Sequence, residues 1–153
     1  MCIRDRHRAT VTLERGDGNC MQKATFLCAL MRAARIPARL GFADIRNHLI
    51  PKELRENMGT DLFVFHGFVE AYLNNRWVRL TPAFDIETCS QHGIVPCEFD
   101  GTNDAMLSPV DVHGQRHFEY VQFRGIYDDF PFEEMFKAAK AVYGSDVDYE
   151  RFS

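Results

Sequence analysis

Three residues whose side chains cooperate in nucleophilic catalysis lie in order along the sequence: Cys20, His66 and Asp85. Cys20 follows the turn-forming residues 16–19 and precedes an amphipathic run, so we expect it at a helix N-terminus. The helix dipole and free backbone N–H groups there favour the thiolate, which is the nucleophilic form of cysteine. A histidine can take the thiol proton, and a carboxylate can orient the imidazole ring.

The segments that must position these residues show alternating helix and strand patterns. Apolar residues at helical spacing predict a helix over 21–34, with Cys20 at the head of its buried stripe, and Pro37 ends it. Alternating and β-branched runs predict four strands, at 38–45, 63–73, 76–81 and 116–124. The remaining patterns predict a strand or arm at 9–14, a short helix at 52–57, a loop-rich segment at 82–109 and a helix at 131–143.

Asn74 and Asn75 predict a tight turn between the second and third strands, because asparagine tolerates positive φ. The register that follows pairs apolar residues on one face, namely Val69 with Leu80 and Ala71 with Val78. His66 lies on the other face, which also carries Tyr72 and Trp77 as a predicted cross-strand pair.

The composition is that of one globular domain. The chain has 153 residues, of which 46% are apolar and 26% charged, and a net charge of −4. The absence of a basic stripe argues against nucleic acid as a partner, and no apolar run approaches the ~20 residues of a membrane span. The five cysteines are an odd number without framework spacing, which predicts free thiols and a cytoplasmic location.

The ends of the chain differ from its centre. Residues 9–144 are expected to form the domain and 145–153 an acidic tail. Residues 1–6 resemble a translated sequencing adapter, so we expect 1–8 to be a non-native or disordered arm. On this interpretation Cys2 is not native and the natural protein begins earlier.

Several motifs follow one another in a characteristic order: Gly18 and Cys20, then Ile36-Pro37-Ala38-Arg39, then His66, Glu70 and Tyr72, then Trp77-Val78 and Pro82. Together they resemble the transglutaminase-like superfamily, whose fold is related to papain-like cysteine proteases. The resemblance covers 16–85 and implies an N-terminally truncated, bacterial-type member. It implies an α+β fold in which an N-terminal catalytic helix packs on an antiparallel β-sheet. It also implies a triad of Cys20, His66 and Asp85.

The sequence departs from the family pattern at three points. Thr81-Pro82 stands where the family often has Asp-Pro, so we assign the third position to Asp85, with Thr81 as the rival. Arg35 replaces a glycine before Ile36, which costs roughly 1 kcal/mol if the backbone is left-handed there. The backbone N–H of Cys20 supplies one oxyanion-hole donor, and the second is expected from sequence upstream of this chain.

Three functional hypotheses follow. The first is a hydrolase or acyltransferase that acts on a peptide, protein or small amide through an acyl-enzyme and needs no cofactor. The second is a degenerate, non-catalytic domain that binds a peptide or protein. The third is a metal site at Cys89, His92 and Cys97, but this spacing is a weak zinc signal, so loop thiols and no metal are expected.

Overall fold

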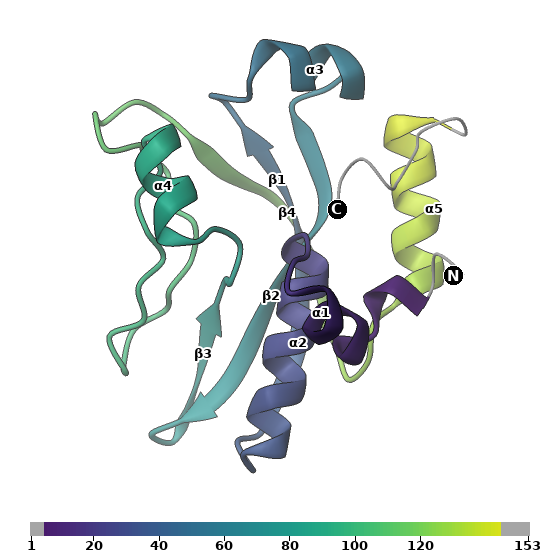
Figure 1. The fold of residues 1–153 in the computed structure, drawn as a ribbon, viewed down its shortest axis with the longest axis vertical. Coiled ribbons are helices and arrows are strands. Elements are labelled where there is room, and N and C mark those ends of the chain that lie inside the picture. The colour runs from purple at the N-terminus through teal and green to yellow at the C-terminus, as the bar shows by residue number, and fades with distance from the viewer. Residues whose placement is uncertain (1–4, 145–153) are drawn as a thin grey trace.

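The computed structural model describes residues 5–144, which form an α+β fold around one antiparallel sheet (Figure 1). The sheet has the order β3-β2-β1-β4, and its strands are β1 (Ala38–Asn47), β2 (Leu62–Leu73), β3 (Arg76–Leu80) and β4 (Phe118–Tyr127). The helices are η1 (Asp5–His7), α1 (Ala9–Arg15), α2 (Cys20–Ala33), α3 (Lys52–Met58), α4 (Ile86–His92) and α5 (Phe132–Tyr143). The predicted fold class is confirmed.

α2 and α5 cover one face of the sheet. Ala24 and Cys28 of α2 are buried in the same apolar cluster as Phe42 of β1, Val69 of β2 and Met135 of α5. Figure 1 shows α2 in front of β2, with α5 beside it. The stripe predicted to begin at Cys20 therefore faces the core, and the helix starts one residue earlier than its periodicity indicates.

The β2–β3 hairpin has the predicted register, with Val69 opposite Leu80 and Ala71 opposite Val78. Asn74 and Asn75 form its turn with φ angles of 50° and 63°. Positive φ at both central residues matches the right-handed twist of the two strands. The predicted pair is also present, because the Tyr72 and Trp77 ring centroids lie 5.3 Å apart.

A second apolar cluster lies beneath α4 and the loops that follow it. Cys89 of α4 and Ile94 pack there with Ile45 of β1 and Phe118 of β4. The structure therefore corrects two predictions, because 82–109 contains a helix and 9–14 belongs to a helix, α1, rather than to a strand. Both helices have seven residues.

Part of the expected N-terminal arm lies within the described residues. Residues 5–7 form η1, and His7 stacks on Phe130 with a centroid distance of 4.2 Å. Residues 1–4 and the predicted acidic tail, 145–153, lie outside the described residues. Among the helices of residues 5–144, none has the length and apolar character needed to span a bilayer.

Candidate active site

α2 begins at Cys20, and a reciprocal pair of hydrogen bonds fixes its first turn. The Asn19 side chain accepts a hydrogen bond from the backbone N–H of Gln22 at 3.0 Å. In return, Gln22 Oε1 accepts one from the backbone N–H of Asn19 at 2.9 Å. This capping box holds Cys20 where backbone N–H groups lack partners within the helix. The predicted turn into a helix at Cys20 is confirmed.

Gly67 of β2 lets the first turn of α2 approach the strand. β3 pairs with β2 only from Val69 onward, so no strand of the described chain covers this edge at Gly67. A Cβ atom on Gly67 would lie 2.9 Å from Met21 Cα and 3.0 Å from Cys20 O. The backbone N–H of Gly67 lies close enough to the Cys20 thiol to lower its pKa. The thiol therefore lies against the residue that directly follows His66.

His66 provides a neutral imidazole. Its side chain is 2% exposed, and burial lowers the His66 pKa to about 4. Its Nε2 atom is buried without a hydrogen-bond partner among the residues that the structure describes. The ring is therefore uncharged at neutral pH, and one of its nitrogens has no hydrogen-bond partner within residues 5–144.

Burial raises the pKa of Cys20 above its ordinary value. The backbone N–H groups of Gly67, Met21 and Cys20 itself lower this pKa, as does the charge of Lys23, but burial outweighs them. The backbone N–H groups at the helix N-terminus thus lower the Cys20 pKa as expected, but burial has the larger effect. The structure brings a thiol of raised pKa to Gly67, the residue next to a neutral imidazole.

Tyr120 of β4 is a third member of this cluster that the sequence analysis did not single out. Its ring stands edge-on to the His66 ring, with centroids 6.1 Å apart. Its hydroxyl oxygen accepts a hydrogen bond from the backbone N–H of Leu107 at 3.3 Å, and the nearby Thr81 hydroxyl lowers its pKa. Burial raises the Tyr120 pKa, and the charge of a Cys20 thiolate would raise it further. Strand alternation in 116–124 was the available signal, but it does not distinguish Tyr120 from its neighbours.

The comparison with family models decides the assignment, because the model of the transglutaminase-like superfamily matches residues 3–82. The chain belongs to this superfamily. The matched segment includes Cys20 and His66 and ends before Asp85. Comparisons with curated proteins and with solved structures gave no significant match.

In this transglutaminase-like domain, several residues of the sequence motifs gather around the buried carboxylate of Glu70. Glu70 is 5% exposed and accepts hydrogen bonds from Arg39 Nε at 2.9 Å and from Arg79 Nε at 3.1 Å. The Arg39 guanidinium also lies 4.1 Å from the centre of the Trp77 ring. The network joins β1, β2 and β3, so these motif residues stabilise the sheet that carries His66.

The structure gives the two rivals for the third catalytic position different surroundings. Thr81 is buried, its Oγ1 donates to Met106 Sδ at 3.4 Å, and its hydroxyl lies near that of Tyr120. Asp85 is exposed and accepts a hydrogen bond from the backbone N–H of Thr88 at 2.7 Å, as the N-cap of α4. That bond lowers the Asp85 pKa. No described contact joins either residue to the His66 ring.

The transglutaminase-like domain keeps its described thiols free. Cys20, Cys28, Cys89 and Cys97 form no disulfide. Cys97 packs on the α4 cluster beside Cys20 and Cys89, and burial raises its pKa to about 11. Within residues 5–144, no three His, Cys, Asp or Glu side chains are arranged to hold a metal ion.

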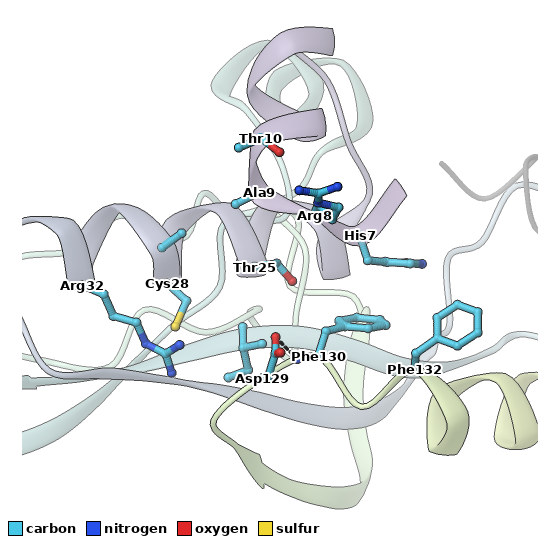
Figure 2. A pocket seen from close by; sticks show the side chains of 12 residues that line it. His7, Arg8, Ala9, Thr10, Thr25, Cys28, Arg32, Asp129, Phe130 and Phe132 are labelled. Atoms are coloured by element: carbon cyan, nitrogen blue, oxygen red, sulfur yellow. Dashed lines mark hydrogen bonds between the residues drawn. The ribbon is translucent and has the colours of Figure 1, made fainter. Parts of the chain in front are cut away.

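One pocket borders the cluster, and another lies apart from it. A pocket of about 660 Å³ is lined by Tyr120, Phe68, Phe123 and Arg79. A second pocket, of about 600 Å³, lies between α2 and the segment that leads into α5, and includes Cys28 (Figure 2). Neither Cys20 nor His66 lines either pocket; the first reaches the cluster through Tyr120, whereas the second lacks Tyr120 as well and is separate from the candidate active site.

Proposed function

We propose that this domain is a thiol-dependent hydrolase or acyltransferase that acts on amide or peptide bonds. The observation that carries the proposal is the close approach of the first turn of α2 to Gly67, where a Cβ atom would lie 3.0 Å from the Cys20 carbonyl oxygen. It brings a half-buried thiol at a helix N-terminus to the backbone neighbour of a neutral imidazole. The membership of the superfamily adds support, because both residues lie in the matched segment.

In the proposed reaction, Cys20 sulfur attacks the carbonyl carbon while its proton passes to His66. The carbonyl oxygen becomes an oxyanion, and the backbone N–H of Cys20 stabilises its charge. Collapse of this intermediate breaks the C–N bond, and the leaving amine takes the proton from His66, which leaves a thioester on Cys20. Water or a second amine gives a proton to His66 and attacks the thioester. Release of the acid or new amide returns the proton to the thiol.

The candidate substrates are peptides, proteins and small amides. The pocket beside Tyr120 offers the acyl donor a place next to the cluster, with Phe68 and Phe123 as apolar walls. The chemistry needs a reduced Cys20. A reducing compartment such as the cytoplasm therefore suits the proposed enzyme.

Acyl-enzyme formation with 4-nitrophenyl acetate tests the proposal. Intact-protein and peptide mass spectrometry would locate the acetyl group, and nitrophenolate absorbance would give the burst and the turnover. We expect acetylation at Cys20, followed by slower hydrolysis. Cys20→Ala should abolish the burst, and His66→Ala should slow it most below neutral pH.

Cys28→Ala is the matched control, because Cys28 is a buried thiol on the same helix outside the cluster. Its burst should equal that of the parent. Turnover that persists in Cys20→Ala would overturn the proposal.

The alternative is a non-catalytic domain that binds a peptide or protein. Two observations favour it: burial keeps the Cys20 thiol protonated, and Asp85 is engaged as a helix cap. It predicts that 4-nitrophenyl acetate labels Cys20 no faster than an ordinary thiol and that His66→Ala leaves this rate unchanged. The acylation experiment therefore separates the two functions.

A further inference from the structure

The residue before His66 has a backbone conformation that bulky side chains rarely adopt. Phe65 has a φ of 56°, in the left-handed region. It lies in a β-bulge, because Ala43 pairs with His66 whereas Ile45 pairs with Phe63, which leaves two residues of β2 opposite Asp44. Such strain persists only where the surroundings hold it, and it is concentrated at functional sites.

The bulge interrupts the alternation of side chains between the two faces of the sheet directly before His66. Val64 and Phe65 are consecutive, yet both are buried in the apolar cluster beneath α2 and α5. In a regular strand, consecutive side chains lie on opposite faces. The extra residue therefore determines which face of the sheet His66 occupies, while Val64 and Phe65 both remain in the core.

Asp44 holds the bulge. Its Oδ1 accepts a hydrogen bond from the Phe65 N–H at 3.1 Å, and the residue is 3% exposed. A second bulge, on β4, brings Arg124 to the same point, because Phe42 pairs with Gly125 and Ala43 with Phe123.

Arg124 fixes the Asp44 carboxylate with two bonds. Nε lies 2.9 Å from Oδ1 and Nη2 lies 2.6 Å from Oδ2. The guanidinium also lies 5.5 Å from the centre of the Phe65 ring. A buried carboxylate that is held at both oxygens has one orientation, so the acceptor for the Phe65 N–H is fixed in space.

We propose that the Asp44–Arg124 pair is a positioning device for His66: it holds Phe65 in the left-handed conformation and so directs the imidazole toward Cys20 and Tyr120. This rests on the proposed function, in which His66 is the base. Asp44 and Arg124 act through Phe65 and touch no reacting atom. They are positioning residues rather than catalytic ones.

The test compares Asp44→Asn with Glu70→Gln. Glu70 of β2 is a similarly buried carboxylate with two arginine partners, Arg39 of β1 and Arg79 of β3, so loss of its charge perturbs the sheet without touching the bulge. We expect Asp44→Asn to slow acetylation of Cys20 by between about 10-fold and 100-fold, because small displacements of a base have effects of this size. Glu70→Gln should acetylate at the parent rate when both variants are equally folded by near-ultraviolet circular dichroism.

Arg124→Lys keeps the cation but loses the paired donors, so its rate should fall between those of the parent and Arg124→Gln. If Asp44→Asn does not fold, the two Arg124 variants provide the test instead. A folded Asp44→Asn or Arg124→Gln variant that acetylates Cys20 at the parent rate would overturn the proposal.

A second readout separates this proposal from the proposed function. The His66 and Tyr120 rings are close enough for a nuclear Overhauser effect between ring protons. We expect Asp44→Asn to lose this effect and Glu70→Gln to keep it. If the parent forms no acetyl-enzyme but the effect depends on Asp44, the catalytic function fails and the positioning stands. If the effect survives in Asp44→Asn, the positioning is wrong whatever the parent catalyses.

Discussion

Gly67 and Met21 approach so closely that a Cβ atom on Gly67 would lie 2.9 Å from the Met21 Cα. The obstacle is backbone, which cannot rotate away as a side chain can. The contact occurs where β3 has ended, so the N-terminus of α2 takes the place of a neighbouring strand along this part of β2. Gly67 thereby brings the backbone of Cys20 against the sheet.

Gly67→Ala should therefore separate α2 from β2. We expect the free energy of unfolding to fall by about 1–3 kcal/mol, as for other overpacked sites. We also expect acetylation of Cys20 to slow. Gly101→Ala is the control, because its φ of 86° is strained for alanine but nothing lies within 4 Å of the added Cβ. Urea unfolding and the acetylation burst give both readouts, and an unchanged burst in a folded Gly67→Ala variant would contradict the prediction.

The buried His66 predicts that acid destabilises the domain. Its pKa is lowered from 6.5 to about 4 in the folded state, so between these values the unfolded chain binds more protons. The stabilisation is complete above the unfolded pKa and is lost as pH falls toward 4, by up to about 3 kcal/mol.

Urea unfolding at several pH values should show this decline, and His66→Gln should weaken it, because glutamine does not titrate. His7, whose pKa burial also lowers to about 4, adds to the decline in the same direction. A pH dependence in His66→Gln as steep as that of the parent would show that His66 ionises freely in the folded protein.

Arg35 offers a stabilising substitution. Its φ is 62°, as expected for a position that the superfamily usually gives to glycine, and its side chain is exposed. Arg35→Gly should raise the free energy of unfolding by up to about 1 kcal/mol without altering acetylation of Cys20. Ala34→Gly, one residue earlier with a φ of −79°, should lower it instead. Equal effects of the two glycines would contradict this account.

Asp85 can be tested for two roles with two substitutions. Asparagine caps helices as well as aspartate does, so Asp85→Asn should keep the stability of α4, whereas Asp85→Ala should lose about 1 kcal/mol. Thermal unfolding measures this difference. If Asp85 also orients His66, both variants should slow acetylation of Cys20. An Asp85→Asn variant with the parent burst would restrict Asp85 to capping.

The sequence predicted correctly those helices and strands whose apolar spacing or turn residues give a strong local pattern. The α2 stripe and the β2–β3 register follow from apolar spacing and from two asparagines that accept positive φ. α4 was missed although its boundaries carry recognisable signals, with Asp85 as N-cap and Gly93 at the left-handed C-cap. α1 was missed because Thr10, Val11 and Thr12 favour strands locally, and contacts with α2 override that preference.

The environment of the site could be predicted less well than its residues. Cys20 lies at a helix N-terminus as expected, but the magnitude of its burial depends on distant segments such as Ala83 and Ile45. The bulge at Phe65 is invisible in an uninterrupted apolar run, since only the partner strands reveal the extra residue. The direction of the Cys20 pKa shift could therefore be obtained only from the tertiary structure. The choice of Cys20 as the candidate nucleophile could be made from the sequence.

The chain has one tryptophan, Trp77, which is 40% exposed beneath the Arg39 guanidinium. It lies next to the hairpin turn, whereas Cys20 meets β2 beyond the point where β3 stops. Fluorescence of this indole is thus a built-in reporter of the sheet, quenched or shifted when the Arg39–Glu70–Arg79 network separates. Loading an acyl group onto the thiol leaves that signal unchanged, so one cuvette can follow unfolding by emission and acylation by absorbance independently.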